Sequence, residues 1–137
     1  MSVRKSDRTE SKFEVLNLIR QLTQYTIQAV GNEKLFPKKS RWVIAQKIAT
    51  ECTEAYANIM GANAIWVDKD SPEDDKKYRR SLQIQAHGHL HSLLALIDIA
   101  YCVYGIEGQK IEYWTTLVRD TDSKLKAWTK AEKQKYS

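Results

Sequence analysis

Helix-breaking residues are rare in this sequence, and their positions constrain the fold more than any other feature. Five glycines and two prolines occur in 137 residues. Most of them separate long segments in which apolar residues recur every three or four positions, a period typical of amphipathic helices. The sequence therefore predicts few, long helices.

The periodicity predicts two helices in the first half of the chain. The first runs from about residue 10 to residue 30, and Gly31 follows it as a C-cap. The segment FPKKSRW starts the second helix, because Pro37 stands where a first-turn proline is tolerated. Gly61 is expected to end this helix.

Two further helices are predicted in the second half. Ser71 and Pro72 form a clear helix start, with the serine as N-cap, the proline in the first position and acids after it. This third helix extends to Tyr104, where Gly105 stops it. Its expected core side consists of Tyr78, Leu82, Ala86, Leu90, Leu93, Ile97, Ala100 and Tyr104. The fourth helix follows the GIEGQ turn, with apolar residues in steps of three and four.

Four amphipathic helices with mostly short links predict an all-α fold, an up-down-up-down four-helix bundle. We expect residues 1–9 to form a flexible basic N-terminal arm, and residues 10–137 to form the bundle with a frayed basic C-terminal tail. The sequence shows neither a signal peptide nor a membrane span, so a cytoplasmic location is expected, with both cysteines as free thiols.

The motif AHGHLH, residues 86–91, places three histidines at alternate positions. On a helix each residue advances by about 100°, so His87 and His91 lie close in angle while His89 points to nearly the opposite side. No HExxH motif or di-iron carboxylate spacing accompanies them, and the sequence predicts no metal and no cofactor. His89 is expected to be a packed, hydrogen-bonded imidazole. The alternative is a metal- or ligand-binding bundle that uses His87, His91 and Asp98.

A second stripe of small or apolar residues on the third helix faces away from the predicted core. We call it the outer stripe, and it consists of Ile84, Gly88, His91, Ala95, Ile99 and Cys102. A helix with two such faces usually needs a second partner. The outer stripe therefore predicts a homo-oligomer interface, in which Gly88 permits close helix approach. The alternative is that a loop or the N-terminal arm covers it.

The formal net charge of +5 is expected to lie at the end of the bundle where the two termini and the link between the second and third helices meet. We call this end the basic pole. Its candidate nucleic-acid-binding residues are Lys76, Lys77, Arg79, Arg80, Lys124 and Lys126. A second cluster, at the opposite end, consists of Lys38, Lys39 and Arg41. Contact with phosphates is expected, with Arg79 and Arg80 foremost. The alternative is a solvated surface, because acids are interspersed.

Catalytic motifs are missing from the sequence. It contains no phosphate-binding glycine loop, no GxSxG motif and no Cys-His pair whose proximity the sequence supports. The chain is therefore expected not to be an enzyme.

Several segments resemble one family of four-helix bundles. They are KFEVLNLIRQL, FPKKSRWVIAQKI, ANIMGAN, YRRSLQIQAHGHLHSLLALIDIAY and IEYWTTLVRDTDSKLKAW, and they cover most of residues 12 to 130. The chain resembles the accessory variability determinant (Avd) proteins of diversity-generating retroelements and the bundle proteins encoded in 23S ribosomal RNA intervening sequences.

The resemblance implies a function that periodicity alone does not. Avd proteins form pentameric barrels with a basic surface, bind the element's reverse transcriptase and nucleic acid, and support mutagenic retrohoming. The same resemblance leaves an alternative: an RNA-binding or structural bundle of the intervening-sequence type, without a reverse-transcriptase partner.

Overall fold

The computed structural model describes residues 5–136, and the side chains of residues 12–135. Within these residues the protein is all-α. Its long helices are α1 (Lys5–Gly31), α2 (Gln46–Ala64), α3 (Glu73–Tyr104) and α4 (Gly108–Tyr136). A short 3₁₀ turn, η1 (Lys38–Ser40), and one turn of π-helix, η2 (Arg41–Ala45), precede α2.

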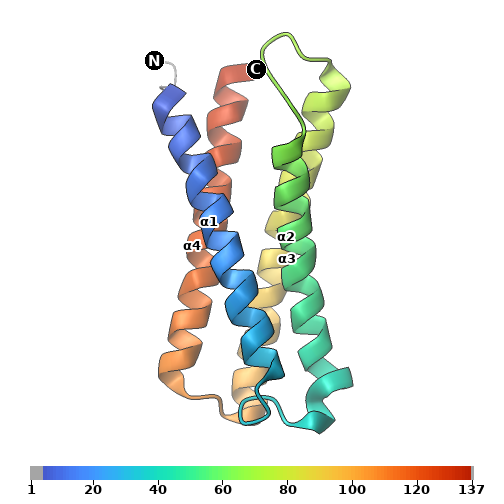
Figure 1. Ribbon diagram of the computed structural model, residues 1–137, viewed down its shortest axis with the longest axis vertical. Coiled ribbons are helices and arrows are strands. Elements are labelled where there is room, and N and C mark those ends of the chain that lie inside the picture. The colour runs from blue at the N-terminus through green and yellow to red at the C-terminus, as the bar shows by residue number, and fades with distance from the viewer. Residues whose placement is uncertain (1–4, 137) are drawn as a thin grey trace.

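The four helices form an up-down-up-down bundle (Figure 1). Each helix runs antiparallel to its neighbours, and α1 packs on α2 and α4 while α3 also packs on α2 and α4. The described ends of the chain and the α2–α3 connection lie at one end of the bundle, and the other two connections lie at the opposite end. The predicted fold class and helix order are thus confirmed for the single chain.

The core contains the apolar stripes that the sequence predicts. Trp114 and Trp128 of α4 are among the largest fully buried side chains. The indole N–H of Trp114 donates to the hydroxyl of Thr26 on α1 over 3.0 Å, so this buried polar group is satisfied. Burial of apolar side chains from all four helices stabilises the bundle.

The predicted core side of α3 is wrong in its first turns. Tyr78 is exposed, whereas Arg79 and Gln83 are buried. The buried positions Arg79, Gln83, Ala86 and Leu90 follow steps of three and four, and Tyr78 lies one residue outside this pattern. Polar side chains therefore occupy the core edge near the α2–α3 connection.

Several helix ends differ from prediction. Helix α1 begins at Lys5, so the expected boundary at residue 10 is too late, and residues 1–4 lie outside the described part of the chain. Ser71 is not the N-cap of α3, because its hydroxyl donates to the Asp68 carboxylate and accepts the Asp68 backbone N–H. Gly105 ends α3 as predicted, at a positive φ of 63° that suits glycine.

Among residues 5–136, no helix combines the length and the apolar character needed to cross a bilayer.

Candidate functional site

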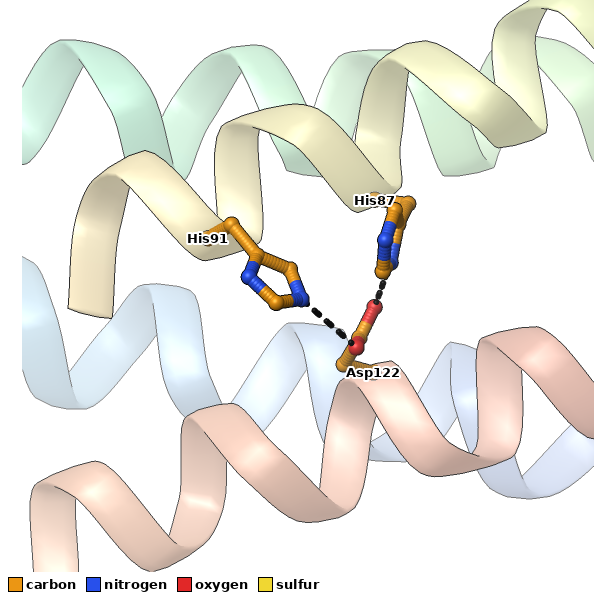
Figure 2. A group of neighbouring side chains, drawn as sticks. All are labelled: His87, His91 and Asp122. Carbon is orange, nitrogen blue, oxygen red and sulfur yellow. Dashed lines mark hydrogen bonds and ion pairs between the residues drawn. The ribbon is translucent and has the colours of Figure 1, made fainter. Parts of the chain in front are cut away.

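His87 and His91 face one carboxylate from another helix (Figure 2). The Nδ1 atom of His87 lies 2.6 Å from Oδ1 of Asp122, and the Nε2 atom of His91 lies 3.4 Å from its Oδ2. The two imidazole rings lie 4.4 Å apart between centroids. Nearby, Nζ of Lys126 is 3.5 Å from the same Oδ2. Helices α3 and α4 thus present two nitrogen ligands and one oxygen ligand to a common point.

Burial distinguishes the three members of this cluster. The side chain of Asp122 is only 11% exposed, whereas His87 is 39% exposed and His91 is 60% exposed. The carboxylate therefore lies under the two rings, and the rings border solvent. Of the three residues, only the two histidines were candidates from the sequence. Asp98, the carboxylate considered with them, is exposed and outside the cluster.

His89 points to a different helix, as the angular argument predicts. Its Nδ1 atom lies 2.6 Å from Oε2 of Glu51 on α2, and both side chains are about two-thirds buried. The expectation of a packed, hydrogen-bonded imidazole is confirmed for His89. A site formed by all three histidines is excluded by this geometry.

Arg79 is enclosed within the bundle. Its guanidinium forms a two-pronged ion pair with the Glu132 carboxylate of α4, in which Nε donates to Oε2 over 3.1 Å and Nη2 donates to Oε1. Nη1 donates to the Ile65 carbonyl oxygen, and the guanidinium carbon lies 5.0 Å from the Trp128 ring centroid. Arg79, predicted as a leading phosphate-binding residue, is buried, and internal partners take its donors, so the structure does not present its guanidinium to solvent.

The other candidate cations of the basic pole differ in how far they are exposed and in whether they contact other residues. Lys77 and Arg80 are exposed, and neither forms an ion pair within the described residues. Lys76 is mostly buried and contacts Glu73 and the Lys69 carbonyl oxygen.

Lys124 and Lys126 lie near the middle of α4 and not at the basic pole, where they were predicted. Lys124 pairs with Glu14 over 2.8 Å, and Lys126 lies one turn from Asp122, level with the histidines of α3. The expected placement of these two lysines at the end of the bundle is therefore wrong. Within the described chain, Lys77 and Arg80 are the candidates of the pole that stay open to an anion.

The second cluster lies on the segment that leads into α2. Lys38, Lys39 and Arg41 are exposed, and Lys38 makes only a loose ion pair with Glu33, at 3.8 Å. Lys38 and Arg41 line a hollow of about 220 Å³ between the end of α1 and the start of α2.

Trp42 is a surface residue that does not belong to the candidate site residues predicted from the sequence. It belongs to the π-helical turn η2 and is 74% exposed. It lines an open groove of about 640 Å³ between α2 and α3, together with Ala95 and Leu96. The wider π-helical turn could not be inferred from apolar periodicity, although the consecutive Trp42 and Val43 were a visible signal of unusual apolar exposure.

The outer stripe is exposed along its whole length. All six of its residues lie on the surface of the single chain, and neither a loop nor another described helix covers them. Apart from α3's own backbone and the neighbours of Gly88 in sequence, no described atom lies within 4 Å of the position where a Cβ atom would be, so no other described helix approaches Gly88 closely. Ala95 belongs to the outer stripe and also lines the groove beside Trp42, so the stripe continues into this groove.

Comparison of the chain with protein-family models, with curated proteins and with solved structures finds no match.

Proposed function

We propose that this protein is a non-enzymatic accessory protein of a diversity-generating retroelement. In this role it assembles into a homo-oligomer, a pentamer by analogy with the Avd proteins it resembles. It acts in the cytoplasm, where it binds the element's reverse transcriptase and a nucleic-acid backbone during mutagenic retrohoming.

The exposed outer stripe is the observation that carries the proposal. Ile84 is 61% exposed and Ile99 is 53% exposed, on a helix whose other side is already buried in the bundle. The adjoining groove adds Trp42 to this apolar surface. Large exposed apolar patches usually mark interaction sites, and aromatic residues commonly anchor them. The surface supports assembly with other protein chains.

The charge distribution supports a nucleic-acid partner. Lys77 and Arg80 are open to solvent near one end of the bundle, and Lys39 and Arg41 are open near the other. Repetition of either group around an oligomer would place several cations along a phosphate backbone, where counterion release favours binding. No base-reading motif accompanies them, which favours contacts that do not depend on sequence.

The intervening-sequence type of bundle is the alternative function, because it has the same fold without a reverse-transcriptase partner. The gene neighbourhood separates the two functions. We expect a reverse-transcriptase gene and a pair of repeats that differ at adenines beside the gene for this protein.

The direct experiment is co-purification. The reverse transcriptase encoded beside the gene is produced with an affinity tag together with this protein, and an unrelated tagged polymerase serves as the control. We expect specific capture, and a particle of several 15.9 kDa chains by sedimentation of the protein alone. A monomer at micromolar concentration that the reverse transcriptase does not capture would contradict the proposal.

A further inference from the structure

We propose that His87, His91 and Asp122 form a binding site for a divalent transition-metal ion such as Zn²⁺, which links α3 to α4. Each residue offers one ligand atom, and the three atoms all lie within 4.8 Å of one another. Two imidazole nitrogens and a carboxylate oxygen are ligands that Zn²⁺ commonly takes in proteins. The site shares one residue, His91, with the outer stripe invoked for the proposed function, and its other two ligands, His87 and Asp122, lie outside that stripe.

The helices place the ligands before any ion binds. His87 and His91 are four residues apart, so their rings project from one face of α3. Asp122 comes from α4, and Figure 2 shows both rings turned toward its carboxylate. Ligand atoms around a tetrahedral Zn²⁺ at about 2.0–2.1 Å lie roughly 3.3 Å apart. Both rings are partly exposed, so they have room to rotate, and the His87–Asp122 contact would lengthen from 2.6 Å when an ion binds.

The two histidines differ in how closely they contact the carboxylate, and only the contact of His87 has the length of a hydrogen bond. His87 makes a short contact with Asp122, at 2.6 Å, but the His91 nitrogen is 3.4 Å from Oδ2, longer than the usual hydrogen bond. The His91 ring thus faces the Asp122 carboxylate but makes no hydrogen bond of ordinary length with it. An ion between the three groups would complete the interaction, and three protein ligands leave a fourth position for water or an added ligand.

The positive charge of Lys126 is expected to weaken the binding of a metal cation at this site. Its ammonium lies 3.5 Å from Oδ2 of Asp122 and balances the carboxylate charge when no metal is bound. The side chain is 64% exposed, so it can swing into solvent when an ion arrives. Removal of this charge is expected to strengthen metal binding, a result that a purely structural hydrogen-bonded cluster does not predict.

The experiment titrates the full, untagged chain, stripped with a chelator, with ZnCl₂ in an isothermal calorimeter. We expect one ion per chain with a dissociation constant in the micromolar range or below. His91→Ala and Asp122→Asn each weaken binding at least tenfold, and Lys126→Met tightens it. His89→Ala is the matched control, because it removes a histidine of the same helix that contacts Glu51 instead.

Circular dichroism of each variant shows whether the bundle is intact, and Lys126→Met keeps the test decisive because it leaves the ligands and the buried carboxylate in place. Saturable binding at one ion per chain that the His91 and Asp122 changes weaken supports the site. Absence of saturable binding at 100 μM ZnCl₂, equal losses in the His89 and His91 variants, or weaker binding by Lys126→Met would overturn it.

Discussion

Arg79 and Glu132 show how one residue pair changes the interpretation of a charged helix end. Both side chains are about nine-tenths enclosed, and Gln83 donates a further hydrogen bond to the Glu132 carboxylate over 3.2 Å. An isolated charge at this depth would be costly, so each member of the pair requires the other. The two residues are 53 positions apart in sequence, and no local pattern predicts their pairing.

Replacement of one partner is therefore expected to destabilise the bundle. Arg79→Met leaves the Glu132 carboxylate buried without its counter-charge, which costs about 3–5 kcal/mol of unfolding free energy. Urea unfolding followed by circular dichroism measures this loss. The matched control is Arg80→Ala, an exposed neighbour that should change stability by no more than about 0.5 kcal/mol. Equal unfolding midpoints for the two variants would show that the Arg79–Glu132 pair contributes nothing to the stability of the bundle.

The two cysteines give a second test at the residue scale. Cys52 is fully buried, and desolvation raises the pKa of its thiol despite opposing hydrogen bonds with Thr26 and Thr23. Its reactive thiolate is therefore scarce at pH 8. Cys102 is exposed in the single chain and belongs to the outer stripe.

We expect a thiol reagent at pH 8 to label Cys102 rapidly in dilute protein and Cys52 only after unfolding. If the outer stripe is an interface, the labelling rate of Cys102 falls as protein concentration rises through the range of self-association. Mass spectrometry of timed samples locates the label. A Cys102 rate that does not change with concentration, in protein that sedimentation shows to be assembled, would place the interface elsewhere.

At the scale of elements, the bundle could be predicted because apolar periodicity and helix breakers are local signals. The stripe of α4, with Trp114, Val118, Leu125 and Trp128, is buried as its spacing predicts. The meeting of Asp122 with His87 and His91 could not be predicted in this way. It depends on how α4 is rotated and shifted against α3, and spacing within one helix contains no information on that relation.

The turn η2 also could not be predicted from apolar spacing. A π-helical turn adds a residue to the helical period, and within this turn Trp42 and Val43 are exposed while Ile44 and Ala45 are buried. Such turns often occur at functional sites, and here it places a large aromatic side chain beside the outer stripe.

Trp42→Ala is therefore expected to weaken self-association without unfolding the bundle. Loss of a buried aromatic anchor at an interface typically costs about 2 kcal/mol or more, roughly a 30-fold rise in the dissociation constant. Sedimentation over a range of concentrations measures it. Trp66→Ala is the control, because Trp66 is similarly exposed, at 79% against 74% for Trp42, but lies in the α2–α3 connection and does not line the groove. Equal effects of both changes would argue against a specific role for Trp42.

At the scale of the whole molecule, charge and apolar surface occupy different places. The exposed cations Lys77 and Arg80 lie near the end that holds the α2–α3 connection, while Lys39 and Arg41 lie near the opposite end. The outer stripe runs along α3 between these ends. Assembly through the stripe would leave the end with Lys77 and Arg80 open, whereas Arg41 directly precedes Trp42, which lines the groove that continues the stripe. Phosphate binding at the Lys77 and Arg80 end can therefore be tested independently of protein assembly.

The two cationic ends of the bundle can be compared directly for nucleic-acid binding. We expect the double variant Lys77→Ala/Arg80→Ala to bind a mixed-sequence oligonucleotide more weakly, whatever its sequence, because phosphate contacts specify no bases. The slope of log affinity against log salt should flatten by about 0.7 to 0.9 for each phosphate that is no longer neutralised. Fluorescence anisotropy at several salt concentrations measures both quantities. Lys39→Ala/Arg41→Ala is the matched control, with the same charge removed at the other end, and sedimentation checks that assembly is unchanged in both. If only this control variant shows weaker binding and a flatter slope, the binding surface lies at the start of α2, beside the hollow lined by Lys38 and Arg41.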